Sequence, residues 1–315
     1  MMGEEENKIL MAAMDLGTNS NRLLIADEHG TPIYRDVRHV ALGDGLAENG
    51  CFSELAMERA ICSFMDFSEM MNAYGVRKYR AIATAACRMS DNTEAFKAEV
   101  KKASGIDLEV ISEFEEARLT LLGARLNAPK DKKYLFVYDL GGGSTEITLA
   151  TNNEKPEILA TVSVPLGARN ATEIFHLSDY NQKGADELEQ SVKKYMMQFL
   201  NKIKDIDYVG QTALIATSST PLRLAAWLSG QGKYDKFLVD GVTVQTAQLD
   251  TLIEKVLQMK FDERAESPYV GRNRAGIFIA ALIIFRTIYQ GLGCDKLTAS
   301  LKGAQEAIVA ELSLQ

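Results

Sequence analysis

The sequence predicts an α/β protein made of two domains of related topology, and three observations support this prediction. Strand-like runs alternate with amphipathic helices, which is typical of a sheet whose crossovers cover its faces. The same order of elements restarts after the polar linker NAPKDKK at residues 127–133. A turn-forming motif also occurs once in each half of the chain. At 315 residues, the chain is long enough for two domains of roughly 150 residues each.

The first half opens with three strand-like runs separated by the turn-rich segments TNS and EHGT, which indicates a three-stranded meander. A helix is then expected between Ser53, a preferred capping residue, and Gly75, a preferred helix terminator. Strands and helices alternate from there on. The expected strands are 8–16, 21–27, 32–40, 79–84 and 108–112, and the expected helices are 54–74, 93–104 and 113–126.

The second half repeats this order, with three strand-like runs followed by helices and single strands. The apolar run at 275–285 is expected to form a core helix, because it is far shorter than the ~20 residues that span a bilayer. The expected strands are 134–140, 145–150, 157–165, 213–218 and 296–300, and the expected helices are about 185–204, 221–229, 275–285 and 302–312.

The composition argues against several classes of protein. With 46% hydrophobic and 25% charged residues, it is that of an ordinary globular protein. Three glutamates stand near the N-terminus where a secretory signal carries positive charge, and the four cysteines lack disulfide-scaffold spacing, so we expect a cytoplasmic protein with reduced thiols. The net charge of -8 argues against a general nucleic-acid binder but leaves room for a local basic cleft that binds a polyanion.

One motif occurs twice, as MDLGTNSNRLLIA at residues 14–26 and as YDLGGGSTEITLA at residues 138–150. Aligning Asp15 with Asp139 gives an offset of 124 residues, at which the Asp, Leu, Gly, Ser and final Ala of the two segments coincide. A tight hairpin turn alone does not require the same aspartate and serine twice. The repeat therefore indicates an internal duplication that gives each domain one such hairpin.

Each hairpin has the residues of a phosphate-binding turn. Glycines let backbone N–H groups face an anion without interference from a Cβ atom, and hydroxyl and amide side chains add donors. An aspartate beside phosphate needs a divalent cation such as Mg²⁺ between the like charges, or a water to orient. A single copy could equally be a plain structural turn, but two copies predict a grip on one phosphate chain from both sides. The predicted phosphate-binding residues of the hairpins are Gly17, Thr18, Asn19, Ser20, Gly141, Gly142, Gly143, Ser144 and Thr145.

The duplicated hairpins resemble those of the actin, sugar-kinase and heat-shock chaperone superfamily. Within it, the chain resembles the Ppx/GppA family of exopolyphosphatases and guanosine pentaphosphate phosphatases, with which four further segments agree in order and spacing. The resemblance implies two duplicated actin-like (ribonuclease H-like) domains with a cleft between them, domain I at 1–124 plus about 304–315 and domain II at 125–303. The four segments are GDGLAENGCFSE (43–54), ATAACRMSDN (83–92), ISEFEEARL (111–119) and LTASLKGAQEAIV (297–309).

The resemblance also implies a reaction. This is the Mg²⁺-dependent hydrolysis of the terminal phosphoanhydride of inorganic polyphosphate and, in some family members, of the 5′-terminal phosphate of pppGpp. The family's general base falls on Glu116, and its second functional acid, which follows the glycine turn, falls on Glu146. Asp139 is expected to take part in catalysis, and Asp15, Asp139 and Glu146 are expected to position the Mg²⁺ ion.

Two arginines, Arg22 and Arg88, stand where the family places cleft-facing arginines and are expected to bind phosphate oxygens, with an ordinary salt bridge as the alternative for Arg22. The segment IATSSTPLRL lacks the glycine found where kinases of the superfamily receive a nucleoside, which argues against a nucleoside pocket and hence against pppGpp. Arg169 is shifted from the family pattern and is given no role.

Two rival functions stay open. An ATP-dependent small-molecule kinase would share the hairpins but would need an adenosine pocket and an acceptor. A non-catalytic polyphosphate or nucleotide sensor would keep the phosphate cradle but would lose the acids that are present here. The chain resembles the short two-domain class of the family, and the sequence leaves a homodimer open.

Overall fold

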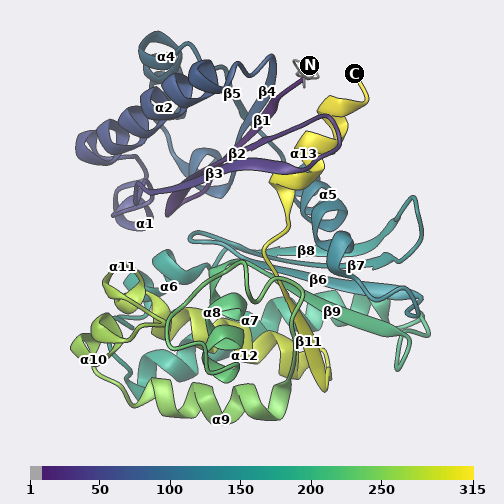
Figure 1. Ribbon diagram of the computed structural model, residues 1–315. Coiled ribbons are helices and arrows are strands. Elements are labelled where there is room, and N and C mark those ends of the chain that lie inside the picture. The colour runs from purple at the N-terminus through teal and green to yellow at the C-terminus, as the bar shows by residue number, and fades with distance from the viewer. Residues whose placement is uncertain (1–8) are drawn as a thin grey trace.

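The computed structural model describes residues 9–315, in which two β-sheets are each covered by helices (Figure 1). Lys8, the first residue of the expected first strand, and the N-terminal glutamates lie outside the described residues. The elements of the first half are β1 (Met11–Leu16), β2 (Ser20–Ala26), β3 (Pro32–His39), α1 (Leu46–Asn49), α2 (Glu54–Tyr74), β4 (Lys78–Ala83), α3 (Ala85–Met89), α4 (Thr93–Ser104), β5 (Leu108–Val110), α5 (Glu113–Ala124) and the 3₁₀ turn η1 (Arg125–Asn127).

The second half contributes the larger sheet and most of its helical cover. Its elements are β6 (Tyr134–Leu140), β7 (Thr145–Thr151), β8 (Ile158–Val164), α6 (Ala168–Ile174), α7 (Gln182–Ile203), β9 (Thr212–Thr217), α8 (Ser219–Leu228), β10 (Thr243–Gln245), α9 (Thr246–Leu257), α10 (Phe261–Glu266), α11 (Arg272–Ala275), α12 (Phe278–Gly291), β11 (Lys296–Ser300) and α13 (Ala304–Ser313).

The two sheets share one construction, which confirms the predicted α/β fold with duplicated topology. The first has the strand order β3-β2-β1-β4-β5, and the second has the order β10-β11-β9-β6-β7-β8. In each sheet the first three strands form an antiparallel meander, and the first strand then pairs in parallel with the strand that follows the next helices. The meander expected from the segments TNS and EHGT is therefore present.

The caps expected from the sequence delimit the first long helix. The Ser53 hydroxyl accepts a hydrogen bond from the N–H of Ala56, and α2 ends at Gly75, whose φ of 69° lies in the left-handed region that glycine tolerates. The short helices α1, α3 and α6 were not expected. With only four, five and seven residues, they are too short to show a helical period in the sequence.

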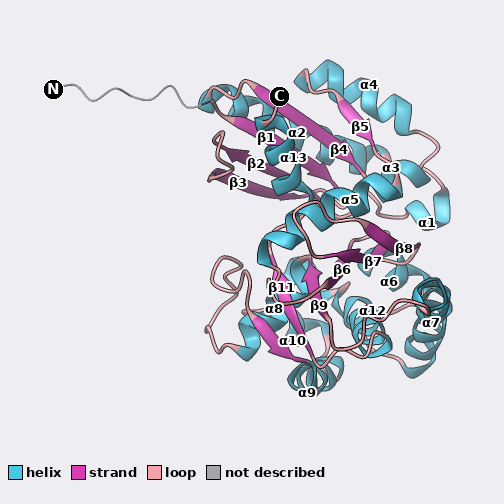
Figure 2. Cartoon of the chain, turned by 90° about the vertical axis from the view of Figure 1, so that its right-hand side faces the viewer, coloured by secondary structure: helices cyan, strands magenta, loops and turns pink. Residues whose placement is uncertain are grey.

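Helix α5 lies between the two sheets, where Figures 1 and 2 both show it. Its residue Leu119 is buried with odd-numbered residues of β1, whereas Leu121 and Ala124 are buried against Leu135 and Val137 of β6. Because side chains alternate along a strand, each sheet presents one face to α5 and the other to its outer helices. The first turn of α5 therefore lies between the two sheets.

The last helix, α13, returns to the first sheet, where Ile308 and Val309 are buried in one cluster with Met11 and Leu119. The chain reaches it by passing α5 closely, because a Cβ atom on Gly123 would lie 1.8 Å from the Gly303 carbonyl oxygen. This is the packing that the family resemblance implies, while the exact domain limits stay predictions. No helix within residues 9–315 combines the length and apolar character needed to cross a membrane.

Candidate active site

The two repeated hairpins are built alike and meet at their tips. In the first, the N–H of Gly17 donates to the Ser20 carbonyl at 3.0 Å, and in the second, the N–H of Gly141 donates to the Ser144 carbonyl at 2.9 Å. None of the glycines in these turns has a positive φ. The glycines of the second hairpin are explained by space and not by a left-handed backbone.

The space is needed because one hairpin packs on the other. A Cβ atom on Gly142 would lie 3.0 Å from Cβ of Thr18 and 3.2 Å from Cβ of Asn19, and one on Gly143 would lie 2.7 Å from Oγ1 of Thr18. A side chain at either glycine would therefore force Thr18 or Asn19 to shift. The glycines of the second hairpin thus allow the two walls of the cleft to approach, a requirement that sequence reasoning, which considered only the anion, had missed.

Buried donors without partners face the space between the hairpins. Thr18, Asn19 and Ser20 are each only 4% exposed, yet Oγ1 of Thr18, Nδ2 of Asn19 and Oγ of Ser20 have no hydrogen-bond partner among the described residues. Buried polar groups in proteins are nearly always satisfied, by protein, water or ligand. These residues line a cavity of about 50 Å³ together with Gly17 and the predicted residues 141–144, so the arrangement fits a bound anion.

The backbone supports the same interpretation. The turn carbonyls are bound on the outer side, since the Thr18 carbonyl accepts from Gly43, the Asn19 carbonyl accepts from Val40, and the Gly142 carbonyl accepts from Arg169. Among residues 9–315, the N–H groups of Thr18, Asn19 and Gly142 donate to no backbone carbonyl. Free N–H groups in a turn can form an anion-binding concavity.

Three carboxylates line the same cavity. Asp15 and Asp139 stand near the carboxyl ends of β1 and β6, and Glu116 comes from the first turn of α5 between the two sheets. Glu116 is 9% exposed, and its Oε2 accepts a hydrogen bond from Nη1 of Arg88 at 2.8 Å. Burial raises the pKa of Glu116 to about 7, opposed by the Arg88 charge and reinforced by Asp139 and Asp15. Burial also raises the pKa of Asp15, although Arg22 lies 3.3 Å away.

Glu146 lies behind this group. In the strand register it lies opposite Asp139. At the same place in the first hairpin, Arg22 lies opposite Asp15. The position opposite the aspartate is therefore an arginine in the first copy of the repeat and a glutamate in the second. Burial raises the pKa of Glu146 well above its ordinary value, and the charges of Glu116 and Asp139 act in the same direction. Oγ of Ser163 donates to its Oε1 at 3.1 Å.

Three of the predicted site residues do not line the cavity between the hairpins. Arg88 points its Nη1 to Glu116 and to the Ile111 carbonyl, Thr145 donates its hydroxyl to the Leu166 carbonyl at 2.7 Å, and Glu146 is 4% exposed. A contact of Arg88 or Thr145 with phosphate therefore stays a prediction. Among the residues that the structure describes, no group of three His, Cys, Asp or Glu side chains could hold a metal ion alone.

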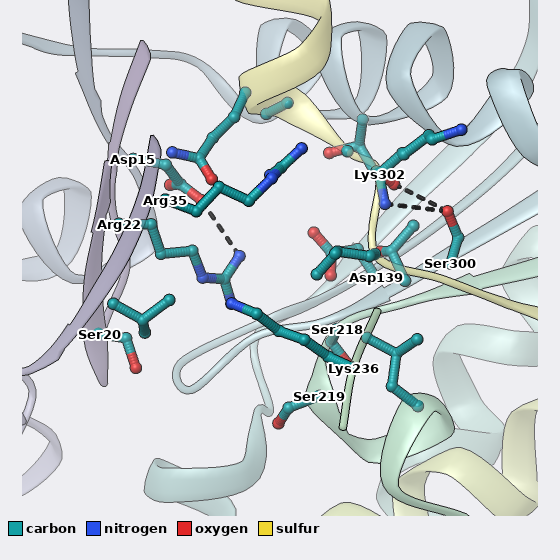
Figure 3. A pocket seen from close by; sticks show the side chains of 18 of the residues that line it. Asp15, Ser20, Arg22, Arg35, Asp139, Ser218, Ser219, Lys236, Ser300 and Lys302 are labelled. Carbon is teal, nitrogen blue, oxygen red and sulfur yellow. Dashed lines mark hydrogen bonds and ion pairs between the residues drawn. The ribbon is translucent and has the colours of Figure 1, made fainter. Parts of the chain in front are cut away.

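A second, larger cavity of about 240 Å³ continues from the hairpins along the cleft (Figure 3). Apart from Arg22, its basic residues were not predicted from the sequence, and one of them, Arg35, pairs with Glu306. Burial lowers the pKa of Lys236 and of Arg274, and neighbouring arginines act in the same direction, so their positive charge is poorly compensated. The basic residues on this cavity are Arg22, Arg35, Arg223, Lys236, Arg274 and Lys302.

The missing glycine of IATSSTPLRL has not removed the turn. Ser218, the N-cap residue of α8, has φ 88° and ψ 175°, a combination that is essentially restricted to glycine. Its hydroxyl is buried without a partner among the described residues, and the residue lines both cavities. The backbone conformation of a glycine turn is therefore kept, while the expectation that no nucleoside binds here stays a prediction.

Comparisons with known proteins agree on the fold and the family. A profile of the Ppx/GppA phosphatase family matches residues 24–315. Exopolyphosphatase 2 of Mycobacterium tuberculosis is 27% identical over 319 aligned positions, which cover 96% of this chain and 98% of that protein. The crystal structure of the Aquifex aeolicus member of the Ppx/GppA family has a TM-score of 0.79 at 25% identity and covers 98% of both chains. An exopolyphosphatase structure from Cytophaga hutchinsonii has the same fold, with a TM-score of 0.87 at 22% identity over 96% of this chain and 97% of that one. The chain thus belongs to the Ppx/GppA phosphatase family and, as the sequence predicts, is a phosphoanhydride hydrolase.

Proposed function

We propose that this protein is a Mg²⁺-dependent exopolyphosphatase that hydrolyses the terminal phosphoanhydride of inorganic polyphosphate. The supporting observation is the basic cleft beyond the hairpins. Six Lys and Arg side chains line the 240 Å³ cavity, against four carboxylates that include the three of the reaction centre. Three of the six are ion-paired, but Arg223, Lys236 and Arg274 form no salt bridge among the described residues. A cleft lined by such positive charge concentrates polyanions. A phosphate chain carries a negative charge on every unit and so matches the whole length of this wall.

The terminal phosphate occupies the small cavity between the hairpins. Backbone N–H groups of both turns, together with the free donors of Thr18, Asn19 and Ser20, hold its oxygens, and the rest of the chain follows the basic wall. These donors are fixed by buried backbone before substrate arrives. Phosphoryl transfer depends mainly on such positioning and charge stabilisation.

Glu116 accepts a proton from the attacking water. Its carboxylate lies on the cavity wall, and Arg88 fixes its orientation through the 2.8 Å hydrogen bond. A general base works best when its pKa is near the working pH, and burial raises the pKa of Glu116 to about 7. The water attacks in line with the leaving phosphate chain, which departs along the basic side of the cleft.

The carboxylates around the cavity fit a divalent cation. Asp15, Glu116 and Glu146 are buried together with raised pKa values, and Asp139 adds to the repulsion in each case. Mg²⁺ is often bound through one or two carboxylates, with water and substrate phosphates as its other ligands. Asp15 and Asp139 would hold it, with Glu146 behind them. Bound there, it would neutralise charge on the phosphate oxygens.

A substrate panel tests the proposal. Purified protein with Mg²⁺ is incubated with polyphosphates of several lengths, with pppGpp, and with ATP in the presence and absence of candidate acceptors, and released phosphate is measured. Fastest release from polyphosphate, abolished by EDTA and restored by Mg²⁺, is the expected result. Preferential release from pppGpp would replace the proposed substrate, ATP turnover that needs an acceptor would favour a kinase, and release from none would favour a sensor.

Two matched lysine variants sharpen the test. Lys236 lies on the basic wall, whereas Lys155 is exposed in the turn between β7 and β8, away from both cavities. Lys236→Met should raise the KM for long polyphosphate, and Lys155→Met should leave it unchanged. Equal effects of the two variants would mean that the basic wall does not bind the chain.

A further inference from the structure

Arg169 joins the two halves of the molecule at the hairpins. It is the second residue of α6, in the larger half, and its side chain is 15% exposed. Its Nε and Nη2 donate to Oδ1 of Asn19 at 3.2 and 2.6 Å, and its Nη1 donates to Oδ1 of Asp44 at 3.1 Å. Both acceptors belong to the first half of the chain, so this arginine spans the cleft at its base.

The contact with Asn19 settles which way that amide faces. An arginine has only donors, so the oxygen of the Asn19 amide must face Arg169 and the NH₂ group must face the other way. That NH₂ group, Nδ2, is buried without a partner among the described residues, and Asn19 lines the small cavity between the hairpins. The free donor is therefore available to an anion in that cavity.

The same residue also holds the second hairpin. The backbone N–H of Arg169 donates to the Gly142 carbonyl at 2.8 Å, which keeps that carbonyl on the outer side of the turn. Arg169 thus fixes the tip of one hairpin through its backbone and the tip of the other through its side chain. No other contact described for these turns reaches both in this way.

We infer that Arg169 is a positioning residue for the phosphate, acting through Asn19. Its guanidinium holds the Asn19 oxygen, so that Nδ2 donates to the phosphate bound between the hairpins. Without Arg169 the amide is free to turn, and its oxygen would then face the anion and repel it. This inference rests on the proposed phosphate site but adds a residue to which the sequence assigned no role.

The alternative is that Arg169 only ties the two halves together. The ion pair with Asp44 could serve that purpose, but it is open to solvent, since the Asp44 side chain is 58% exposed, and pairs of this kind contribute little to stability. The two roles differ in how Arg169 and Asn19 depend on each other. A positioning role acts only while the Asn19 amide is present, whereas a tie between the halves acts regardless of it.

A double-mutant cycle separates the two roles. The variants are Arg169→Met, Asn19→Ala and the combination, with Asp44→Asn as the control that removes the ion pair and leaves the Asn19 contact. The affinity for inorganic phosphate in the presence of Mg²⁺ is measured by calorimetry, kcat and KM for polyphosphate are measured in parallel, and thermal unfolding checks that each variant is folded.

Each single variant should weaken phosphate binding by about 10- to 100-fold, the range of a hydrogen bond to a charged group. The double variant should be no weaker than Asn19→Ala alone. Arg169→Lys, which keeps a donor-only head group, should restore part of the affinity, and Asp44→Asn should bind as the wild type does. Losses that multiply in the double variant, or an Asp44→Asn loss equal to that of Arg169→Met, would overturn the inference.

The calorimetric measurement of phosphate binding also distinguishes this inference from the proposed function. If phosphate binding follows the expected double-mutant cycle but the wild type does not hydrolyse polyphosphate, the proposed function is contradicted and the role of Arg169 is kept. Failure of the wild type to bind inorganic phosphate at all would overturn both the cradle and the inference.

Discussion

Replacing Glu116 by glutamine should change how the stability of the metal-free protein depends on pH. Burial raises the pKa of Glu116 from 4.5 to about 7, so the folded state holds its proton more tightly than the unfolded state does. Below pH 4.5 Glu116 is protonated in both states, so it does not lower the free energy of unfolding. As the pH rises from 4.5 to 7, the unfolded state releases the proton first, so stability falls, and the cost is complete above pH 7.

The size of the effect follows from the shift. At about 1.4 kcal/mol per pKa unit, the ionised carboxylate costs on the order of 3 kcal/mol, of which about 2 to 3 kcal/mol develops between pH 5 and pH 8. Asp15 and Glu146 act in the same direction but are present in both proteins. The difference between wild type and Glu116→Gln therefore reports the contribution of Glu116 together with its effect on the pKa of Glu146.

The assay is equilibrium urea unfolding in EDTA at several pH values. The stability of the wild type, relative to that of Glu116→Gln, should fall by about 2 to 3 kcal/mol from pH 5 to pH 8. In Glu116→Gln, Arg88 has lost its carboxylate partner, which changes the free energy of unfolding of the variant by the same amount at every pH. This loss therefore does not obscure the pH dependence. Parallel stability curves would refute the conclusion that Glu116 is buried among like charges.

Three further predictions test the site and its frame. Arg88→Met should move the acidic limb of the kcat/KM pH profile to higher pH by about 1 to 3 units, because the Arg88 guanidinium opposes the raised pKa of Glu116. The profile is measured by phosphate release, and an unmoved limb would show that Arg88 does not act on the pKa of Glu116. Ile308→Ala, in the fully buried core between α13 and β1, should cost about 2 to 5 kcal/mol in urea unfolding, whereas Leu314→Ala, 88% exposed, should cost almost nothing. Gly142→Ala should lower kcat/KM because its methyl group forces the hairpin tips apart, and unchanged kinetics would show that the tips need not touch.

The parts of the site that the sequence predicted are those encoded locally. Each hairpin lies within a short motif, and the repeat at a fixed offset indicates that both belong to one duplicated fold. Once the order of strands is known, the ends of β1 and β6 must face a common cleft, which places Asp15 and Asp139 near each other. Glu116 could be assigned only through the family resemblance, because acidic residues are common at helix N-termini for purely local reasons.

The basic wall of the cleft could not be predicted in this way. Arg35 comes from β3, Lys236 from the long connection between α8 and β10, and Lys302 from the crossing into α13. Their meeting depends on how the two sheets are placed, and no sequence period relates them. The one local signal was the alternation of side chains along β3, which puts Arg35 on the same face as Val37 and His39.

Two residues show why a motif does not fix every side chain. Arg169 looked displaced from its family position, yet in the fold it reaches across the cleft to the first hairpin. Ser218 replaces an expected glycine, yet it adopts the backbone conformation that glycine would have. Both outcomes depend on tertiary contacts, which can hold a residue in a place or a conformation that its own preferences do not favour.

The turnover and binding of Glu116→Gln test whether paired hairpins hold the phosphate while Glu116 activates the water. Polyphosphate binding and the rate of phosphate release are measured on the same preparation with Mg²⁺. Binding should be kept while kcat falls by about 100- to 10,000-fold, the usual contribution of a general base. A rate close to that of the wild type would remove Glu116 from the mechanism.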